Sequence, residues 1–156
     1  MILKSLDRTR YRSKIALSDA YFLTRVEPMV INKKNFKSPF GCLVSKVMLQ
    51  EDMNATGTFM RIMSDQFAHY LKKFSWVHIH YMLIYSDIEE EHLEYMAIVC
   101  EKLKKAQLEA CRTISKFFAS SMDVMGHVID RERLKASPEK IVRIEAWTTP
   151  RNKRQL

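Results

Sequence analysis

The stretch FSWVHIHYMLIY, residues 74–85, is rich in β-branched and aromatic side chains from end to end. It is too long for one ordinary strand, and among its middle positions only His78 and His80 are polar. A turn near His80 and Tyr81 divides it naturally into two strands. The stretch therefore predicts an antiparallel hairpin, around which the rest of the chain can be placed.

The residues after the hairpin predict an amphipathic helix that runs to about Leu108. Ser86 and Glu89 stand three apart, which is the spacing of a capping box at a helix start. Apolar residues then recur at helical spacing and define the expected buried face: Leu93, Met96, Val99 or Cys100, and Leu103.

The C-terminal part combines strands with one more helix. SKFFASSMDVMGHVID, residues 115–130, resembles two short strands around a turn. Ser137 followed by Pro138 is typical of a helix start. The predicted final helix carries Ile141, Ile144 and Trp147 and stops at Thr149 and Pro150.

Before the hairpin, two strands and a helix are expected. KIALSDAYF (14–22) and GCLVSKVML (41–49) are predicted strands, and NKKNFKSPFG (32–41) has turn chemistry. A helix is predicted over 54–72 with Asn54 as its cap. Its core face would hold Phe59, Met63, Phe67 and Tyr70. This order of elements predicts the α+β class.

The composition favours one globular domain. The 156 residues are 47% hydrophobic and 28% charged, which is unlike a disordered tail. No apolar run approaches the roughly 20 residues of a membrane span, and no secretory signal opens the chain. We therefore expect an intracellular protein, cytoplasmic or nuclear, without a membrane partner. The cysteines are three and widely spaced, so they predict free thiols: Cys42, Cys100 and Cys111.

A net charge of +8 and a pI near 9.5 would attract a polyanion, of which nucleic acid is the commonest. A solvated surface of mixed charge is the alternative interpretation. The basic residues fall in three groups: Lys33, Lys34 and Lys37; Lys102, Lys104 and Lys105; and Arg151, Lys153 and Arg154.

Four stretches, taken in order, resemble the reverse transcriptases of LTR retrotransposons of the Ty3/Gypsy group. YRSKIALSDAYFLTRVEP (11–28) resembles the strand with the first catalytic aspartate. FKSPFG (36–41) through NATGTFMRIM (54–63) resembles Pro-Phe-Gly followed by Asn-Ala-Pro-x-Thr-Phe. IHYMLIYSDIEEEHLEYM (79–96) resembles the Tyr-x-Asp-Asp hairpin with its trailing helix, and residues 125–156 are similar to the segment at the palm-to-thumb junction.

The resemblance implies a reverse-transcriptase palm: an antiparallel sheet with helices packed on one face, ending at the palm-to-thumb junction. Residues 1–156 would form a single partial palm domain. The fingers would be mostly absent, and the thumb, RNase H and integrase regions absent altogether.

The resemblance also implies that the catalytic carboxylates are replaced. The family holds two Mg²⁺ ions with three aspartates, one in the first strand and two at the hairpin turn. Their positions fall at Ala16, His80 and Tyr81, and the hairpin tyrosine falls at His78. Methyl, imidazole and phenol groups are poor magnesium ligands. We therefore expect an inactive polymerase site with no cofactor in this chain.

Remnants of the family's nucleotide pocket would be Asp19, Tyr21 and Gln50. A turn role for Asp19 and a core role for Tyr21 are the structural alternatives. The family's Pro-Phe-Gly-Leu-Thr would fall at residues 49–53, where Glu51 and Asp52 add two negative charges that should repel a triphosphate.

Three other functions are open. His78 and His80 alternate along the predicted strand and could form a zinc pair. The basic palm could have kept a weak, non-specific affinity for an RNA or DNA template-primer. Exposed apolar surface could serve protein interactions. The sequence leaves the oligomeric state undetermined.

Overall fold

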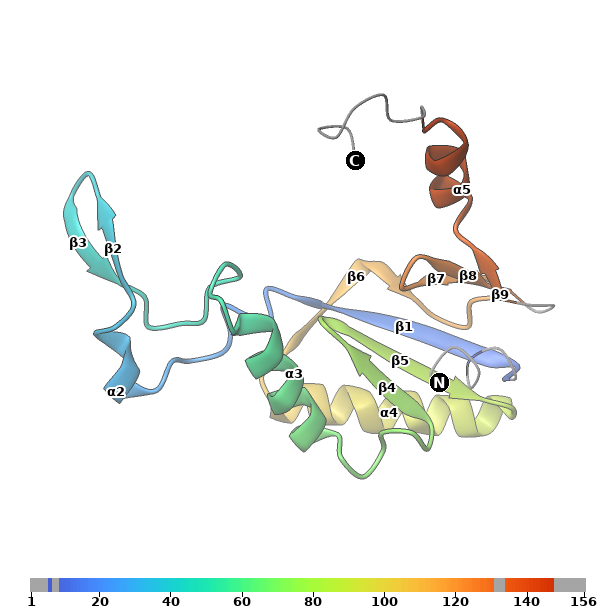
Figure 1. The fold of residues 1–156 in the computed structure, drawn as a ribbon. Coiled ribbons are helices and arrows are strands. Elements are labelled where there is room, and N and C mark those ends of the chain that lie inside the picture. The colour runs from blue at the N-terminus through green and yellow to red at the C-terminus, as the bar shows by residue number, and fades with distance from the viewer. Residues whose placement is uncertain (1–5, 7–8, 131–133, 148–156) are drawn as a thin grey trace.

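The computed structural model describes residues 6, 9–130 and 134–147. Its centre is a four-stranded antiparallel sheet in the order β4-β5-β1-β6 (Figure 1). The predicted hairpin is confirmed and supplies two of these strands. The four strands are β1 (Tyr11–Ser18), β4 (Ser75–His78), β5 (Tyr81–Ser86) and β6 (Glu109–Lys116).

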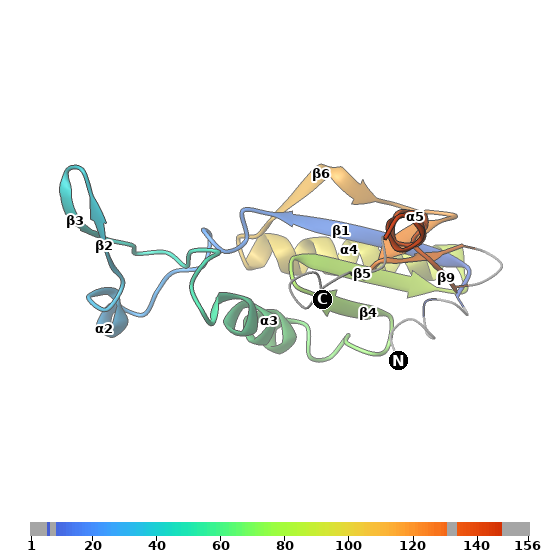
Figure 2. The same cartoon turned by 45° about the horizontal axis from the view of Figure 1, so that its top comes forward.

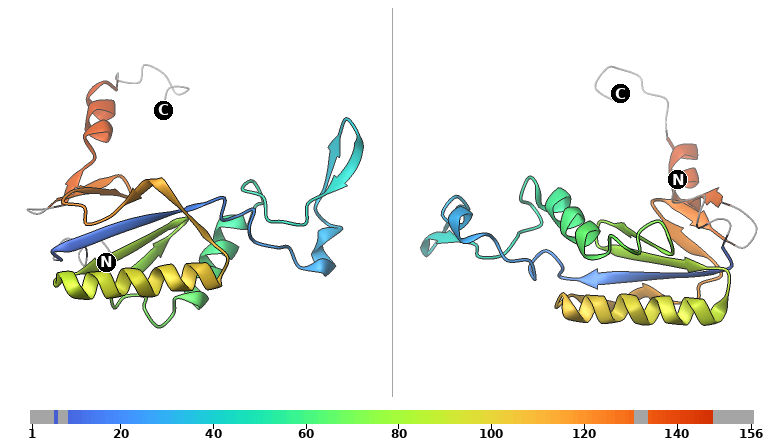
Figure 3. Two further views of the ribbon diagram at one scale, coloured as in Figure 1. Left: turned by 180° about the vertical axis from the view of Figure 1, so that it is seen from behind. Right: turned by 90° about the horizontal axis from the view of Figure 1, so that it is seen from below.

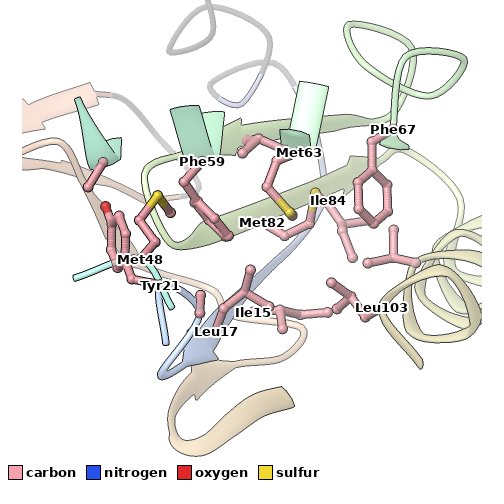
Figure 4. Close-up of a cluster of buried hydrophobic side chains, with 14 of the residues drawn as sticks. Ile15, Leu17, Tyr21, Met48, Phe59, Met63, Phe67, Met82, Ile84 and Leu103 are labelled. Atoms are coloured by element: carbon pink, nitrogen blue, oxygen red, sulfur yellow. The ribbon is translucent and has the colours of Figure 1, made fainter. Parts of the chain in front are cut away.

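Two helices pack on one face of this sheet, α3 (Ala55–Gln66) and α4 (Glu89–Lys105). Alternation along the strands directs Ile15 and Ile84 to this face. Figure 4 shows how the helical side chains of this core meet those of the strands. Fully buried members of this core include Ile15, Phe59, Met63, Phe67, Met82, Ile84 and Val99.

A small three-stranded sheet covers part of the opposite face (Figure 3, left). It contains β7 (Met122–Val124), β8 (His127–Ile129) and β9 (Leu134–Ala136), and α5 (Pro138–Glu145) follows it. The turn predicted within residues 115–130 is therefore confirmed, whereas β9 was not predicted. A second apolar cluster joins the two sheets: Leu6, Leu83, Tyr85, Met122, Val124 and Ile129.

Residues 28–44 form an arm that projects from the central sheet (Figures 1 and 2). It contains α2 (Pro28–Ile31), β2 (Asn35–Ser38) and β3 (Gly41–Val44), and β2 pairs with β3. The turn predicted within residues 32–41 is present, but residues 35–38 of this segment form a strand that was not predicted. The turn is limited to Pro39 and Phe40, because the polar residues before it pair with the backbone of β3 and so form a strand.

The predicted helices differ at their ends. Helix α3 begins after Asn54 as expected but ends at Gln66, and the Asn54 side chain donates or accepts no capping hydrogen bond. Helix α4 begins after Ile88, and the capping box is wrong because the Ser86 hydroxyl donates to the Ile88 carbonyl oxygen instead. Helix α4 ends at Lys105, and the chain then forms β6.

The buried face of α4 also differs from the prediction. Leu93 is 55% exposed, whereas its neighbour His92 is fully buried. His92 is inside because serine hydroxyls on β1 and β5 bind its two ring nitrogens. These two hydrogen bonds therefore turn His92, and not Leu93, toward the core in the first turn of the helix. Val99 and Leu103 are buried as predicted.

Of the remaining predictions about the elements, some are confirmed and some are wrong. The first strand ends at Ser18, because Asp19 adopts a φ of +46° and begins a turn. Helix α5 begins at Pro138 and carries Ile141 and Ile144 as predicted, but it ends at Glu145, so the prediction that it also carries Trp147 is wrong. All three side chains are exposed. Thr149 and Pro150 lie outside the described residues.

The three cysteines are free. In the described part of the chain, no helix has the length and apolarity needed to cross a membrane. The α+β class, with antiparallel sheets and helices on one face, is confirmed.

Candidate functional site

The three positions at which the resemblance expects aspartates meet where β1 passes the turn between β4 and β5. Ala16 is fully buried and lies directly opposite Tyr81 in the β1-β5 register. The Leu17 N–H donates to the His80 carbonyl oxygen at 2.8 Å. The rings of His80 and Tyr81 have centroids 4.1 Å apart. Residues that are far apart in the sequence therefore converge on one point of the sheet.

The turn separates the two histidines of the zinc hypothesis. His78 is the last residue of β4, and Ile79 adopts a φ of +53°, so His80 is in the turn and not in a strand. His78 and His80 line different pockets. The premise that they alternate along one strand is wrong. Across residues 6, 9–130 and 134–147, no group of three or more His, Cys, Asp or Glu side chains could hold a metal ion.

The first pocket lies between the central sheet and the β7-β8 turn and has a volume of about 370 Å³. Lys14 Nζ lies 4.8 Å from the centre of the Tyr81 ring and donates to the Asp123 carbonyl oxygen at 3.2 Å. Burial and the charge of Lys116 lower the Lys14 pKa, and Asp123 opposes them. The described residues that line it are Lys14, His78, Ile79, Tyr81, Leu83, Asp123, Val124, Met125 and Gly126, and Asp123 is the only acid among them.

The second pocket, of about 240 Å³, gathers the three residues predicted to be remnants of a nucleotide pocket. Asp19, Tyr21 and Gln50 line it together with His80 and Cys111. Burial lowers the His80 pKa, and the charges of His78 and Lys14 lower it further. A cationic His80 is therefore disfavoured at this point.

Asp19 and Tyr21 also have the structural roles considered for them. The Asp19 carbonyl oxygen accepts a hydrogen bond from the Leu23 N–H, which closes the turn after β1. Tyr21 is buried, and its ring centroid is 5.3 Å from that of Phe59. Its hydroxyl lies 3.4 Å from Thr56 Oγ1. Packing and turn geometry account for both residues without a nucleotide.

Asp52 does not carry a free negative charge into the second pocket. Its carboxylate accepts hydrogen bonds from Lys34 Nζ at 2.5 Å and from the Leu49 N–H at 2.8 Å. The bond from Lys34 holds the Asp52 pKa below its usual value. The expectation that Asp52 repels a triphosphate is wrong, because the ion pair neutralises its charge and Asp52 does not line this pocket. Glu51 is exposed.

The basic candidates do not form one group. Lys34 also donates to the Val47 carbonyl oxygen, so it ties the arm to the segment that precedes α3, and it is largely shielded from solvent. Lys33 and Lys37 are exposed on the arm. The third group, Arg151, Lys153 and Arg154, lies outside the described residues.

Lys14 is the site residue that the sequence analysis missed. A signal for it was available, because residues two apart on a strand share one face and Lys14 is two residues before Ala16. The sequence could not show that a second element, the β7-β8 turn, would close over the same face.

No family model matches the chain. It is 22% identical over 160 residues to the "Retrovirus-related Pol polyprotein from transposon gypsy" of Drosophila melanogaster, covering 96% of the chain and 14% of that protein. It is 24% identical over 155 residues to the "Transposon Tf2-3 polyprotein" of Schizosaccharomyces pombe, covering 99% of the chain and 12% of the relative. The chain thus spans about a seventh or less of these relatives.

Solved structures of a foamy viral protease-reverse transcriptase share the fold. The protein in complex with double-stranded DNA superimposes with a TM-score of 0.88 at 19% identity, over 99% of this chain and 27% of that chain. The protein in complex with an RNA/DNA hybrid gives a TM-score of 0.84 at 19% identity, over 99% of this chain and 21% of that chain.

Proposed function

Because the homologues of this chain are retrotransposon Pol polyproteins and its fold is that of a reverse transcriptase, we propose that it is a Ty3/Gypsy-type reverse-transcriptase-like domain without polymerase activity. The observation that carries the proposal is the convergence of Ala16, His80 and Tyr81 on one point of the sheet. These are the positions at which the resemblance expects aspartates.

The side chains at this point do not fit two magnesium ions. Mg²⁺ requires anionic or strongly polar oxygen ligands in octahedral geometry, and two-metal catalysis uses ions about 4 Å apart. Ala16 offers a methyl group, and imidazole nitrogen suits zinc, copper or nickel better than magnesium. The acids named in the two pocket linings lie apart, since Asp19 lines the pocket of His80 and Asp123 lines the pocket of Tyr81.

The local charge also opposes a cation. The Lys14 ammonium lies over the Tyr81 ring, and Lys116 is close enough to lower the Lys14 pKa. A divalent cation brought to Tyr81 would meet this positive charge in a partly buried setting, where water screens it less than at a free surface.

Primer extension tests the proposal. The purified chain, with its folding checked by circular dichroism, is incubated with a primed RNA template, a primed DNA template and Mg²⁺ or Mn²⁺, beside an active polymerase as a positive control. We expect no product above the no-protein reaction. Template-dependent extension that rises with the concentration of the chain would overturn the proposal.

Nucleic-acid binding without chemistry is a second candidate. Related structures hold double-stranded DNA or an RNA/DNA hybrid, and this chain carries a net charge of +8 with Lys33 and Lys37 exposed. Phosphate contacts by lysine and arginine do not depend on the catalytic residues. Fluorescence anisotropy with labelled duplexes should show binding whose association constant falls as salt is added, with a linear relation between the logarithm of the constant and the logarithm of the salt concentration. Absence of binding at low ionic strength would exclude it.

A further inference from the structure

We propose that the outer face of α4 binds the same face of a second copy of this chain, with the two helices antiparallel. Such a contact is isologous, so the same residues of both copies take part in it. The inference is independent of the proposed function, because none of the residues that line the two pockets of the candidate site belongs to α4.

The outer face of α4 is an exposed stripe with the spacing of a coiled-coil seam. Its members alternate at intervals of three and four residues, and all five are exposed: Glu90, Leu93, Ala97, Cys100 and Lys104. Val99 and Leu103, which pack in the core, lie on the opposite side of the helix. Both views of Figure 3 place α4 on the outside of the fold, so a second helix can reach this stripe.

The middle of the stripe is apolar. Leu93 is 55% exposed, and the Cys100 thiol is exposed as well. Ala97 at the centre carries only a methyl group, so the axis of a second helix can come close to it. In an antiparallel pair centred on Ala97, Leu93 of one copy lies against Cys100 of the other. The contact would therefore remove the exposed leucine of each copy from water.

The two ends of the stripe carry opposite charges. Glu90 and Lys104 are each seven residues from Ala97, so Glu90 of one copy meets Lys104 of the other, and this pair forms twice. Within one chain they cannot meet, because fourteen residues of helix separate them by about 21 Å. Neither forms an ion pair with another described residue. Parallel helices would place like charges together, so the charges select the antiparallel orientation.

Other charges oppose the contact and limit its strength. Glu94 of one copy would face Glu101 of the other, although Lys105 offsets the Glu101 charge through an ion pair at 2.6 Å. The net charge of +8 repels two copies at long range, and salt screens this repulsion beyond about 8 Å at 0.15 M. A contact of one helix per copy is also small beside the roughly 1,200 Å² that stable interfaces bury. We therefore expect a weak dimer.

Charge reversal tests the antiparallel pairing. Sedimentation equilibrium at 0.15 M salt measures the dimer dissociation constant of wild type, Glu90→Lys, Lys104→Glu and the double variant. Each single reversal should weaken dimerisation about ten-fold, because like charges then face each other twice. The double variant should return to within about three-fold of wild type. Both reversals oppose the helix dipole of their own chain, so thermal unfolding should show no such recovery in the double variant.

Two outcomes of this experiment would overturn the inference. One is a wild type that stays monomeric at about 1 mM, where even a weak dimer is populated. The other is a double variant that dimerises no more tightly than the single reversals, because Glu90 and Lys104 would then not meet across the two copies.

Ala97→Glu tests whether the stripe is the contact. It places two carboxylates at the centre of the pair and should abolish dimerisation, while the fold survives because the position is exposed. Gln66→Glu adds the same charge at an exposed position of α3 and is the matched control. A folded Ala97→Glu protein that dimerises like Gln66→Glu would show that the copies meet through another face, and the inference would fail.

Discussion

The Ser13 hydroxyl lies 2.8 Å from Nε2 of His92, a fully buried histidine in the first turn of α4. On the other side of the ring, Nδ1 lies 3.0 Å from the Ser86 hydroxyl, which donates its proton to the Ile88 carbonyl oxygen. Ser86 must therefore accept from Nδ1–H. The Ser13 proton can go to Nε2 or to Met96 Sδ, which lies 3.5 Å away, and the ring nitrogen is the stronger acceptor, so the two bonds favour the neutral Nδ1–H tautomer.

This arrangement predicts an acid-sensitive contribution to stability. Burial lowers the His92 pKa below the 6.5 of an exposed imidazole, so the unfolded chain binds the proton more tightly. The contribution of His92 is complete above pH 6.5 and is lost as the pH falls toward the folded pKa, at up to about 1.4 kcal/mol per pH unit. Urea unfolding of wild type and His92→Gln between pH 5 and 7.5 measures it.

Comparing the pH dependence of unfolding of the wild type with that of His92→Gln isolates the contribution of His92, because His80 and the carboxylates are present in both. We expect the free energy of unfolding of wild type to fall more steeply with acid than that of His92→Gln. Parallel pH profiles would show that the serine pair does not enforce the neutral ring.

Ser13 should matter for stability beyond its size. Its oxygen also accepts a hydrogen bond from the Phe118 N–H at 3.1 Å. Ser13→Ala leaves His92 Nε2 and this N–H unpaired, so it should cost about 1–3 kcal/mol in urea unfolding. Ser38→Ala, at a turn of the exposed arm, is the control and should change stability by less than about 0.5 kcal/mol. Equal effects would mean that water replaces the lost hydroxyl in the core.

Phe59 should be among the most sensitive core positions. It is fully buried between α3 and the sheet, so Phe59→Ala should destabilise the fold by about 3–5 kcal/mol. Phe40→Ala removes the same side chain where it is 94% exposed and should have almost no effect. Thermal and urea unfolding of both variants provides the comparison, and a mild effect at Phe59 would contradict the observed packing of α3.

Lys33 and Lys34 are adjacent but should behave differently. Lys34→Gln breaks the ion pair with Asp52, so it should cost about 1–2 kcal/mol of stability. Lys33→Gln should leave stability unchanged but lower the salt slope of duplex binding by about 1, if the arm contacts phosphates. Unfolding and anisotropy on both variants test this, and a shared phenotype would contradict the assigned roles.

Cys111 should be a reactive thiol. Hydrogen bonds from the Thr113 hydroxyl and from the Ile114 backbone lower its pKa, and its side chain is partly exposed. Alkylation by iodoacetamide at pH 7, followed by peptide mass spectrometry, should slow several-fold at Cys111 in Thr113→Val and stay unchanged at Cys100. An unaltered Cys111 rate would show that Thr113 does not stabilise the thiolate.

Local signals in the sequence predicted many of the elements. The β-rich run of residues 74–85 could only be divided by a turn, and Phe59, Met63 and Phe67 share one helical face. Prediction failed where contacts with residues distant in the sequence decide the secondary structure or the burial of a residue. Asn35–Ser38 looks like a turn and becomes a strand because β3 lies beside it. His92 looks polar and is buried because two distant serines satisfy its ring.

The same distinction between local sequence and tertiary contacts applies to the candidate site. The sequence by itself determined which side chains stand at Ala16, His80 and Tyr81, and hence that no carboxylate is there. Only the tertiary structure decided that Lys14 meets Tyr81 beneath the β7-β8 turn, that the two histidines face different pockets, and that Asp52 is neutralised by Lys34. Residue chemistry is local, whereas charge and burial depend on neighbours brought from across the chain by strand register.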